Sequence, residues 1–117
     1  MSYIDGFLAA VPTANKQTYL DMAKRCVPVF KKHGMISMTE CWGDDVPEGK
    51  VTSMPMAVQC KADETVVFSW MVWPDKATRD KGMQAAMEDP VMDMENNDMP
   101  FDGKRMIFGG FHVLLES

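Results

Sequence analysis

Apolar side chains follow two spacings along this chain, one typical of strands and the other typical of helices. Residues 2–11 are rich in apolar and small side chains and end at Pro12, which predicts a first strand. Residues 35–42, 65–73 and 105–115 have the composition of three further strands, with β-branched and aromatic residues in dense runs. The chain therefore has enough strand segments to build one sheet.

Residues 51–60 also have a composition that favours a strand. Pro55 in this segment cannot donate a backbone hydrogen bond to a neighbouring strand, so we expect the segment at a sheet edge or at a bulge. The four residues 61–64 then predict a short turn into the strand over 65–73. This pattern adds one strand segment before the hairpin.

Two other segments have helical spacing. In residues 13–34 apolar side chains recur every three or four positions, and polar side chains fill the opposite face. Gly34 is suited to end this helix, and Pro28 inside it removes a backbone donor and is expected to kink it. Residues 74–90 predict a second helix between two prolines. The order of elements predicts an α+β fold of the ferredoxin-like βαββαβ plan, with an extra strand segment.

The strands over 65–73 and 105–115 are apolar on both faces. Ser69 is the one polar side chain between Val66 and Trp73. A sheet with one face in water would alternate polar and apolar residues, and two helices can cover only one face. A second copy of the chain, packed sheet to sheet, is the simplest cover for the other face. We therefore predict a homodimer that forms an α+β barrel.

Length and charge narrow the classes of function. A chain of 117 residues is expected to form one domain, residues 1–117. Its net charge of -5 argues against a nucleic-acid partner, which would require a basic face. The first residues carry Asp5 and no basic run, so we expect no signal peptide, and no apolar run reaches the roughly 20 residues of a membrane span. Three cysteines without C-x-x-C spacing indicate free thiols and predict a cytoplasmic protein.

The stretch ECWGDDVPEGKVTS, residues 40–53, could be a cation site or a turn. Asp44, Asp45 and Glu48 could offer oxygen ligands to a divalent cation, but they lack the spacing of a calcium loop. Because Asp, Gly and Pro also favour turns, we interpret the stretch as a solvated loop. The 13 methionines could suit copper, but we interpret them as flexible core filling. We expect no metal and no other cofactor.

Seven residues are candidates for binding a ligand in the barrel, whereas the sequence assigns no catalytic residue. Asp5 and His112 place polar groups on apolar strands, and a carboxylate there needs a partner. Residues 99–105 could form a lip over the barrel, or simply a tight turn. Trp42 could pack under a loop or line the mouth of the barrel. The candidates are Asp5, Trp42, Trp70, Phe101, Asp102, Arg105 and His112.

Three long motifs resemble a known family. They are ECWGDDVPEGKVTSMPMAV, DETVVFSWMVWPDKATRDKGM and MPFDGKRMIFGGF, and together they span residues 40–111. They resemble the YbaA-like group of small bacterial proteins of unknown function, which is placed in the dimeric α/β-barrel superfamily. The resemblance implies a ferredoxin-like protomer and a two-fold barrel, but it implies no activity, because a fold alone does not determine function.

Three functions remain open from the sequence. The first is the binding of a small apolar or weakly acidic organic molecule in the barrel cavity of a cytoplasmic homodimer. The second, by analogy with the superfamily that the resemblance implies, is a cofactor-free oxygenase or isomerase. The third is a structural or partner-binding dimer with a filled core. Convergent polar groups inside a cavity would distinguish the first two, and the sequence offers Asp5, Ser69 and His112.

Overall fold

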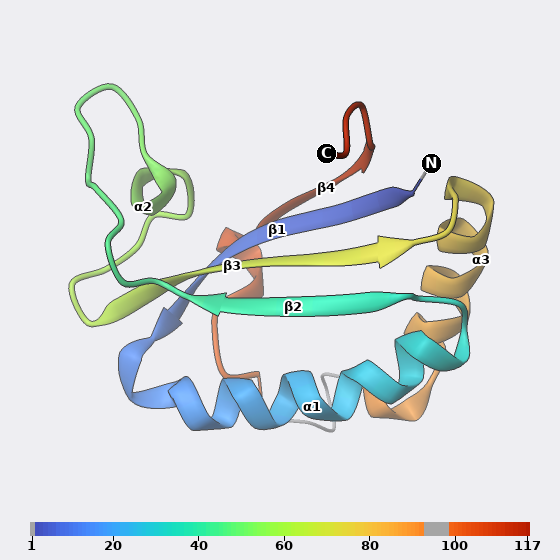
Figure 1. The fold of residues 1–117 in the computed structure, drawn as a ribbon. Coiled ribbons are helices and arrows are strands. Elements are labelled where there is room, and N and C mark those ends of the chain that lie inside the picture. The colour runs from blue at the N-terminus through green and yellow to red at the C-terminus, as the bar shows by residue number, and fades with distance from the viewer. Residues whose placement is uncertain (1, 93–98) are drawn as a thin grey trace.

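Two layers make up the molecule, a four-stranded antiparallel sheet and a layer of two long helices (Figure 1). The computed structural model describes residues 2–92 and 99–117. The strands occur in the order β2-β3-β1-β4, and every neighbouring pair is antiparallel. Their bounds are Tyr3–Pro12 for β1, Ser37–Trp42 for β2, Glu64–Trp73 for β3 and Ile107–His112 for β4.

The helices α1, Lys16–Lys32, and α3, Lys76–Met87, lie on the same side of the sheet (Figure 1). The buried face of α1 carries residues at helical spacing, as the sequence predicts. After α1 the chain turns at Gly34, where a φ of 108° suits glycine. The side chain of Asp75 caps α3 by accepting a hydrogen bond from the backbone N–H of Thr78 at 2.7 Å.

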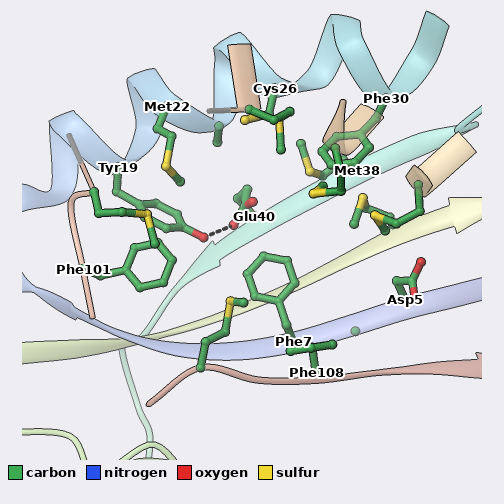
Figure 2. Close-up of a pocket in the computed structure, with 18 of the residues that line it drawn as sticks. Asp5, Phe7, Tyr19, Met22, Cys26, Phe30, Met38, Glu40, Phe101 and Phe108 are labelled. Atoms are coloured by element: carbon green, nitrogen blue, oxygen red, sulfur yellow. Dashed lines mark hydrogen bonds between the residues drawn. The ribbon is translucent and has the colours of Figure 1, made fainter. Parts of the chain in front are cut away.

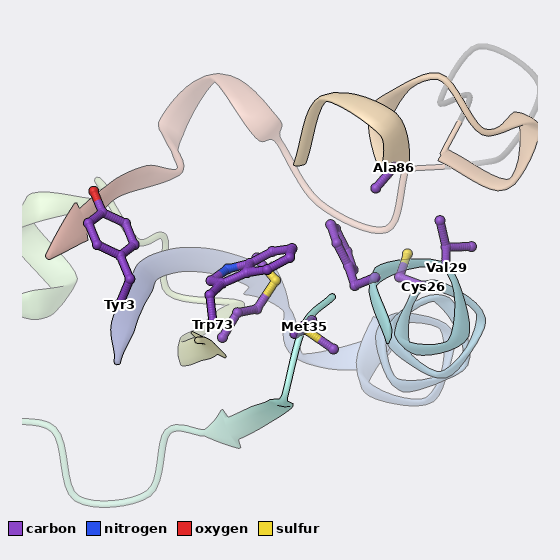
Figure 3. Packing of buried hydrophobic residues seen from close by; sticks show 8 residues of the cluster. Tyr3, Cys26, Val29, Met35, Trp73 and Ala86 are labelled. Carbon is purple, nitrogen blue, oxygen red and sulfur yellow. The ribbon is translucent and has the colours of Figure 1, made fainter. Parts of the chain in front are cut away.

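Trp73 lies at the centre of the core between the sheet and the helices. It is fully buried, and its ring meets that of Phe30 edge to face at a centroid distance of 6.4 Å. Figure 3 shows the cluster around it, to which α1 contributes Cys26 and Val29 and α3 contributes Ala86. This cluster fixes both helices against one end of the sheet.

The prediction of a strand over residues 51–60 is wrong. The segment contains one turn of helix, α2, Met54–Ala57, and no strand. Ser53 caps this turn by accepting a hydrogen bond from the N–H of Met56 at 3.1 Å, and Pro55 lies in its first turn, where a missing N–H costs nothing. The sheet therefore has four strands and lacks the extra segment. Val58, just after α2, is fully buried on the sheet face opposite α1.

The final strand is shorter than predicted. Of residues 105–115, β4 covers Ile107–His112, because residues 103–105 form a 3-10 turn. Asp102 starts this turn by accepting a hydrogen bond from the backbone N–H of Lys104 at 3.0 Å. The cap from Asp102 thus stabilises a turn where the composition of the following residues favours a strand.

The sheet is apolar on both faces, as the sequence predicts. The face toward α1 and α3 buries Ser69 and Trp73 completely. On the opposite face, Phe68 is 44% exposed and Phe111 is 61% exposed. Within the described residues, the loop that contains α2 covers one end of this face, and the rest is open.

Candidate functional site

A cavity of about 490 Å³ lies between α1 and the face of the sheet that the helices cover (Figure 2). This volume falls in the usual range for small-molecule sites, roughly 300–1,000 Å³. Its walls come from every strand, from α1 and α3, and from the segment before β4. Most of the side chains are methionine or phenylalanine, among them Phe7, Met22, Phe30, Met38, Phe101 and Phe108.

Three hydroxyl and carboxyl groups converge at the wall of this cavity. The sheet register places Glu40 of β2 directly opposite Ser69 of β3, so both side chains point toward α1. Ser69 Oγ donates a hydrogen bond to Oε1 of Glu40. Tyr19 of α1 donates its hydroxyl to the same oxygen at 2.7 Å (Figure 2). Glu40 and Tyr19 line the cavity directly.

Burial controls the protonation of this cluster. It raises the pKa of Glu40 above the ordinary 4.5, although the hydrogen bonds from Ser69 and Tyr19 partly oppose the rise. Burial and the nearby carboxylate together raise the pKa of Tyr19, so its hydroxyl remains a hydrogen-bond donor. Among the ion pairs of the described residues, none includes Glu40. Glu40 is thus a carboxyl group in an apolar cavity, partnered by two neutral hydroxyls.

Asp5 lines the same cavity in a different environment. The guanidinium of Arg79 forms an ion pair with it, with Nη2 at 2.7 Å from Oδ1 and Nε at 3.0 Å from Oδ2. The indole N–H of Trp73 donates to Oδ2 at 2.9 Å. The partner that the sequence predicts for Asp5 is therefore the guanidinium of Arg79 on α3. The indole N–H of Trp73 is its third donor.

Asp102 and Arg105 form a separate network outside the residues that line the cavity. The Arg105 guanidinium makes two bonds of 2.7 Å to the carboxylate of Glu64 and one of 3.0 Å to Asp102. It also donates to the backbone oxygen of Gln59 at 2.8 Å. These contacts lower the pKa of Glu64 and fasten the segment before β4 to β3. The network holds the chain in place rather than facing a ligand.

Of the aromatic candidates, Phe101 is the one that the structure brings to the cavity. Its ring lies against Tyr19 at a centroid distance of 5.6 Å. Trp42 packs against the buried residues around Tyr19 near the start of α1, and Lys16 Nζ lies 5.4 Å from its ring centre. Trp70 lies on the opposite face of the sheet, where the centres of its ring and that of Phe68 are 5.3 Å apart.

His112 is exposed at the end of β4, where its ring meets Tyr3 edge to face at 5.1 Å. It is not among the residues that line the cavity. The acidic loop is a surface feature, with Asp44, Asp45 and Glu48 exposed. In residues 2–92 and 99–117 no group of three or more His, Cys, Asp or Glu side chains could hold a metal ion.

The residues that sequence reasoning missed are Glu40 and Tyr19. Tyr19 fits the apolar stripe of α1, so its hydroxyl gives no signal of its own. Glu40 lies two positions from Met38 and two from Trp42 along β2. Residues at this spacing in a strand share a face of the sheet. The lone polar Ser69 on a buried face was the other available signal. Pairing these two required the register of β2 on β3.

The thiol nearest the site is that of Cys26, which lines the cavity from α1. Burial raises its pKa, so the thiol is protonated and a weak nucleophile at neutral pH. Cys41 alternates out of this face, and all three cysteines are free. In the described part of the chain no helix is long and apolar enough to cross a membrane.

Comparison with known proteins gives a family without an assigned activity. A family model described as "Protein of unknown function (DUF1428)" matches residues 2–103. The uncharacterized protein YbaA of Escherichia coli strain K12 is 48% identical over 116 residues, which cover 99% of both chains. The protein of that name from Shigella flexneri has the same identity and coverage. The YbaA-like resemblance of the three motifs is therefore confirmed.

Proposed function

The chain belongs to the DUF1428 family, and we propose that it binds a small, largely apolar organic molecule in the cavity beside Glu40. The observation that carries this proposal is a cavity of about 490 Å³ with apolar walls and a single carboxyl group that has no cationic partner among the described residues. Such a combination of broad apolar lining and few polar groups is typical of small-molecule sites.

The walls suit an apolar ligand for two reasons. Removing apolar surface of the ligand from water supplies affinity without demanding a fixed shape. Methionine side chains, such as Met22 and Met38, are flexible and polarisable, so they can adjust to a flat or a branched molecule. The same cavity argues against the alternative of a dimer with a filled core.

Filling the cavity tests this proposal. Ala23 lies on the cavity side of α1, and Ala23→Phe would place a ring in the space. We expect the wild-type protein to bind naphthalene, measured by its fluorescence, and the variant to bind it about 10-fold more weakly or worse. Ala62→Phe, in an exposed turn, is the matched control and should bind like the wild type. A wild-type protein that binds no naphthalene would refute the proposal.

We further propose that the fold is of the ferredoxin-like kind and that two copies form an α+β barrel. The strand order β2-β3-β1-β4, with α1 and α3 on one face, supports the first part. The open face supports the second. The side chains that it presents include Phe68, Trp70 and Phe111. The charged strand residue on this face, Glu64, lies at the start of β3 and is paired with Arg105.

The occupant that we assign to this face is a second copy of the chain. The protein carries a net charge of -5, so two copies repel one another over most of their surfaces. An apolar face whose charged strand residue, Glu64, is already paired with Arg105 can meet its own copy around a two-fold axis without bringing unpaired like charges together.

Three free cysteines agree with a cytoplasmic location, which we also propose, because thiols remain reduced in the cytoplasm.

Light scattering distinguishes this assembly from a monomer. We expect a wild-type mass of twice 13.2 kDa at micromolar concentration. Phe111→Glu would bury a charge in the interface and should return the mass to that of one chain. Val51→Glu places the same charge on a side chain that is 96% exposed in a loop, and it should leave the dimer intact. A wild-type monomer that unfolds cooperatively would contradict the dimer.

Glu40 also supports a second candidate function, a proton-transfer enzyme of the isomerase type. A buried carboxyl group whose pKa is raised keeps its proton to a higher pH than an ordinary carboxyl group, which suits general acid–base catalysis. The polar groups beside it, Tyr19 and Ser69, both point at Glu40 itself. Because the geometry offers no separate donor for a developing oxyanion among the described residues, we place binding first.

A further inference from the structure

The two oxygens of the Glu40 carboxyl group differ in their surroundings. Oε1 accepts hydrogen bonds from both Tyr19 and Ser69. Among the residues that the structure describes, no donor bonds to Oε2, yet Glu40 lines the cavity. An ionised carboxylate can accept up to about four hydrogen bonds, so Oε2 retains the capacity to accept one from a ligand.

From this asymmetry we propose that the ligand carries a weakly acidic hydroxyl group, of the phenol or enol type, which donates its hydrogen bond to Oε2 of Glu40. The inference rests on the proposed binding function and adds the chemical class of the ligand. One neutral donor completes the coordination of the carboxylate without bringing a second charge into the cavity.

An anionic ligand fits these groups less well. A carboxylate in the cavity would lie beside the carboxylate of Glu40 and be repelled by it. The guanidinium that could compensate, that of Arg79, is already engaged by Asp5 and by Asp80. The positive charge in this cavity is thus already balanced by protein carboxylates.

An organic cation fits less well for a different reason. An ammonium group brings three N–H donors, whereas Oε2 is the acceptor that Glu40 still offers to the cavity. The remaining donors would face methionine and phenylalanine side chains and lose their hydration. A hydroxyl group brings a single donor, so its match to the available acceptor is closer.

The lining also favours an aromatic body for the ligand. Phe101 and Tyr19 meet at 5.6 Å on one side of Glu40, and Phe108 lines the cavity from β4. Aromatic rings in such a lining offer edges and faces for a flat ring to pack against. We therefore choose 2-naphthol as a probe, with naphthalene as the same body without the donor.

Binding of the hydroxyl should depend on pH through Glu40. The ionised carboxylate accepts a stronger hydrogen bond than the neutral acid does, and burial raises the pKa of this group. Among the described residues, the other titratable groups facing the cavity are Tyr19, Cys26, Asp5 and Arg79. Burial raises the pKa of Tyr19 and of Cys26, which both remain neutral, and Arg79 forms an ion pair with Asp5. Affinity for 2-naphthol should therefore rise with pH as Glu40 ionises.

Fluorescence titrations at pH 4 and pH 8 test the inference. At pH 8 the wild type should bind 2-naphthol about 10-fold more tightly than naphthalene, as expected for a hydrogen bond to a charged group. Glu40→Gln should remove most of this preference, and so should pH 4, below the ordinary pKa of the group. The exposed Glu48→Gln is the matched control and should keep both the preference and its pH dependence. If Glu40→Gln fails to fold, Glu40→Met provides an apolar side chain of similar length.

Each other outcome has a distinct meaning. Equal binding of naphthalene and 2-naphthol, unchanged in Glu40→Gln, would overturn the hydroxyl inference and leave the proposed binding function standing. Failure of every probe to bind would refute the binding function itself. Tighter binding of 2-naphthoate or of 1-naphthylmethylammonium than of 2-naphthol would replace the hydroxyl class with an anion or a cation.

Discussion

Asp5 and Glu40 are two carboxyl groups of one cavity, and their partners differ. Asp5 receives two donors from the guanidinium of Arg79 and one from the indole of Trp73. Glu40 receives two neutral hydroxyls, both on the same oxygen. The first group has a full set of partners within the protein, whereas the second has an acceptor oxygen to which no described residue donates.

The difference separates a structural group from a group available for binding. Arg79 lies on α3 and Asp5 on β1, so their ion pair joins a helix to a central strand. The ring of Tyr3 lies 5.1 Å from the guanidinium, and Gly110 leaves the space that Tyr3 and Arg79 occupy, because a Cβ there would collide with both. The contacts of Asp5 hold α3 and β3 against β1. Among the described residues, Oε2 of Glu40 makes no such structural contact.

The largest effect that we predict is for Arg79→Ala. It would leave the carboxylate of Asp5 buried without its charge partner, and breaking such a pair typically costs about 3–5 kcal/mol. Because Arg79 is partly exposed, we expect the lower end, about 3 kcal/mol of unfolding free energy, measured in urea. Arg25→Ala, on an exposed position of α1, is the control and should cost less than about 0.5 kcal/mol. Equal losses in the two variants would show that Asp5 does not need its partner.

A smaller loss is expected for Tyr19→Phe. The change keeps the ring against Phe101 and removes the hydroxyl that bonds to Glu40. A hydrogen bond to a charged group contributes about 1.5–3 kcal/mol, so we expect a loss near 1.5 kcal/mol at pH 8. At pH 4, where Glu40 is neutral, the loss should be smaller. Tyr3→Phe removes the other tyrosine hydroxyl, away from Glu40, and a loss of the same size and pH dependence there would contradict this reasoning.

Much of the fold could be predicted from spacing and local signals. The strands β1, β2 and β3, the helices α1 and α3, and the apolar character of both sheet faces all follow from the pattern of side chains. Residues 51–60 could not be read in this way, because an apolar composition favours a strand while Ser53 and Pro55 favour the start of a helical turn. The local cap decides the outcome at that position.

The candidate site was less accessible to sequence reasoning. Asp5 and Phe101 do line the cavity, but Glu40 was hidden in a stretch that reads as a strand end followed by an acidic loop. Its role depends on the register that places it opposite Ser69 and on the position of Tyr19 on α1. Residues that are 21 and 29 positions apart in the chain meet there, and no local pattern encodes such a meeting.

The smallest effect that we predict, Glu40→Gln, has the opposite sign at neutral pH. The pKa of Glu40 is raised in the folded protein, so between the ordinary value of 4.5 and the folded value the native state binds more protons than the unfolded chain. Stability attributable to this group therefore falls as pH rises through that window. Glutamine removes the charge and retains an oxygen that can accept from Tyr19 and Ser69.

We therefore expect Glu40→Gln to unfold at a higher urea concentration than the wild type at pH 8, with a gain below about 1 kcal/mol. The gain should shrink toward zero at pH 4, where the wild-type carboxyl group is neutral in both states. Asp5→Asn provides the contrast, because it removes the charge that Arg79 requires and should destabilise the protein at pH 8. If both amides destabilise the protein equally at pH 8, the two carboxyl groups are equivalent, and Glu40 has no special capacity for a ligand.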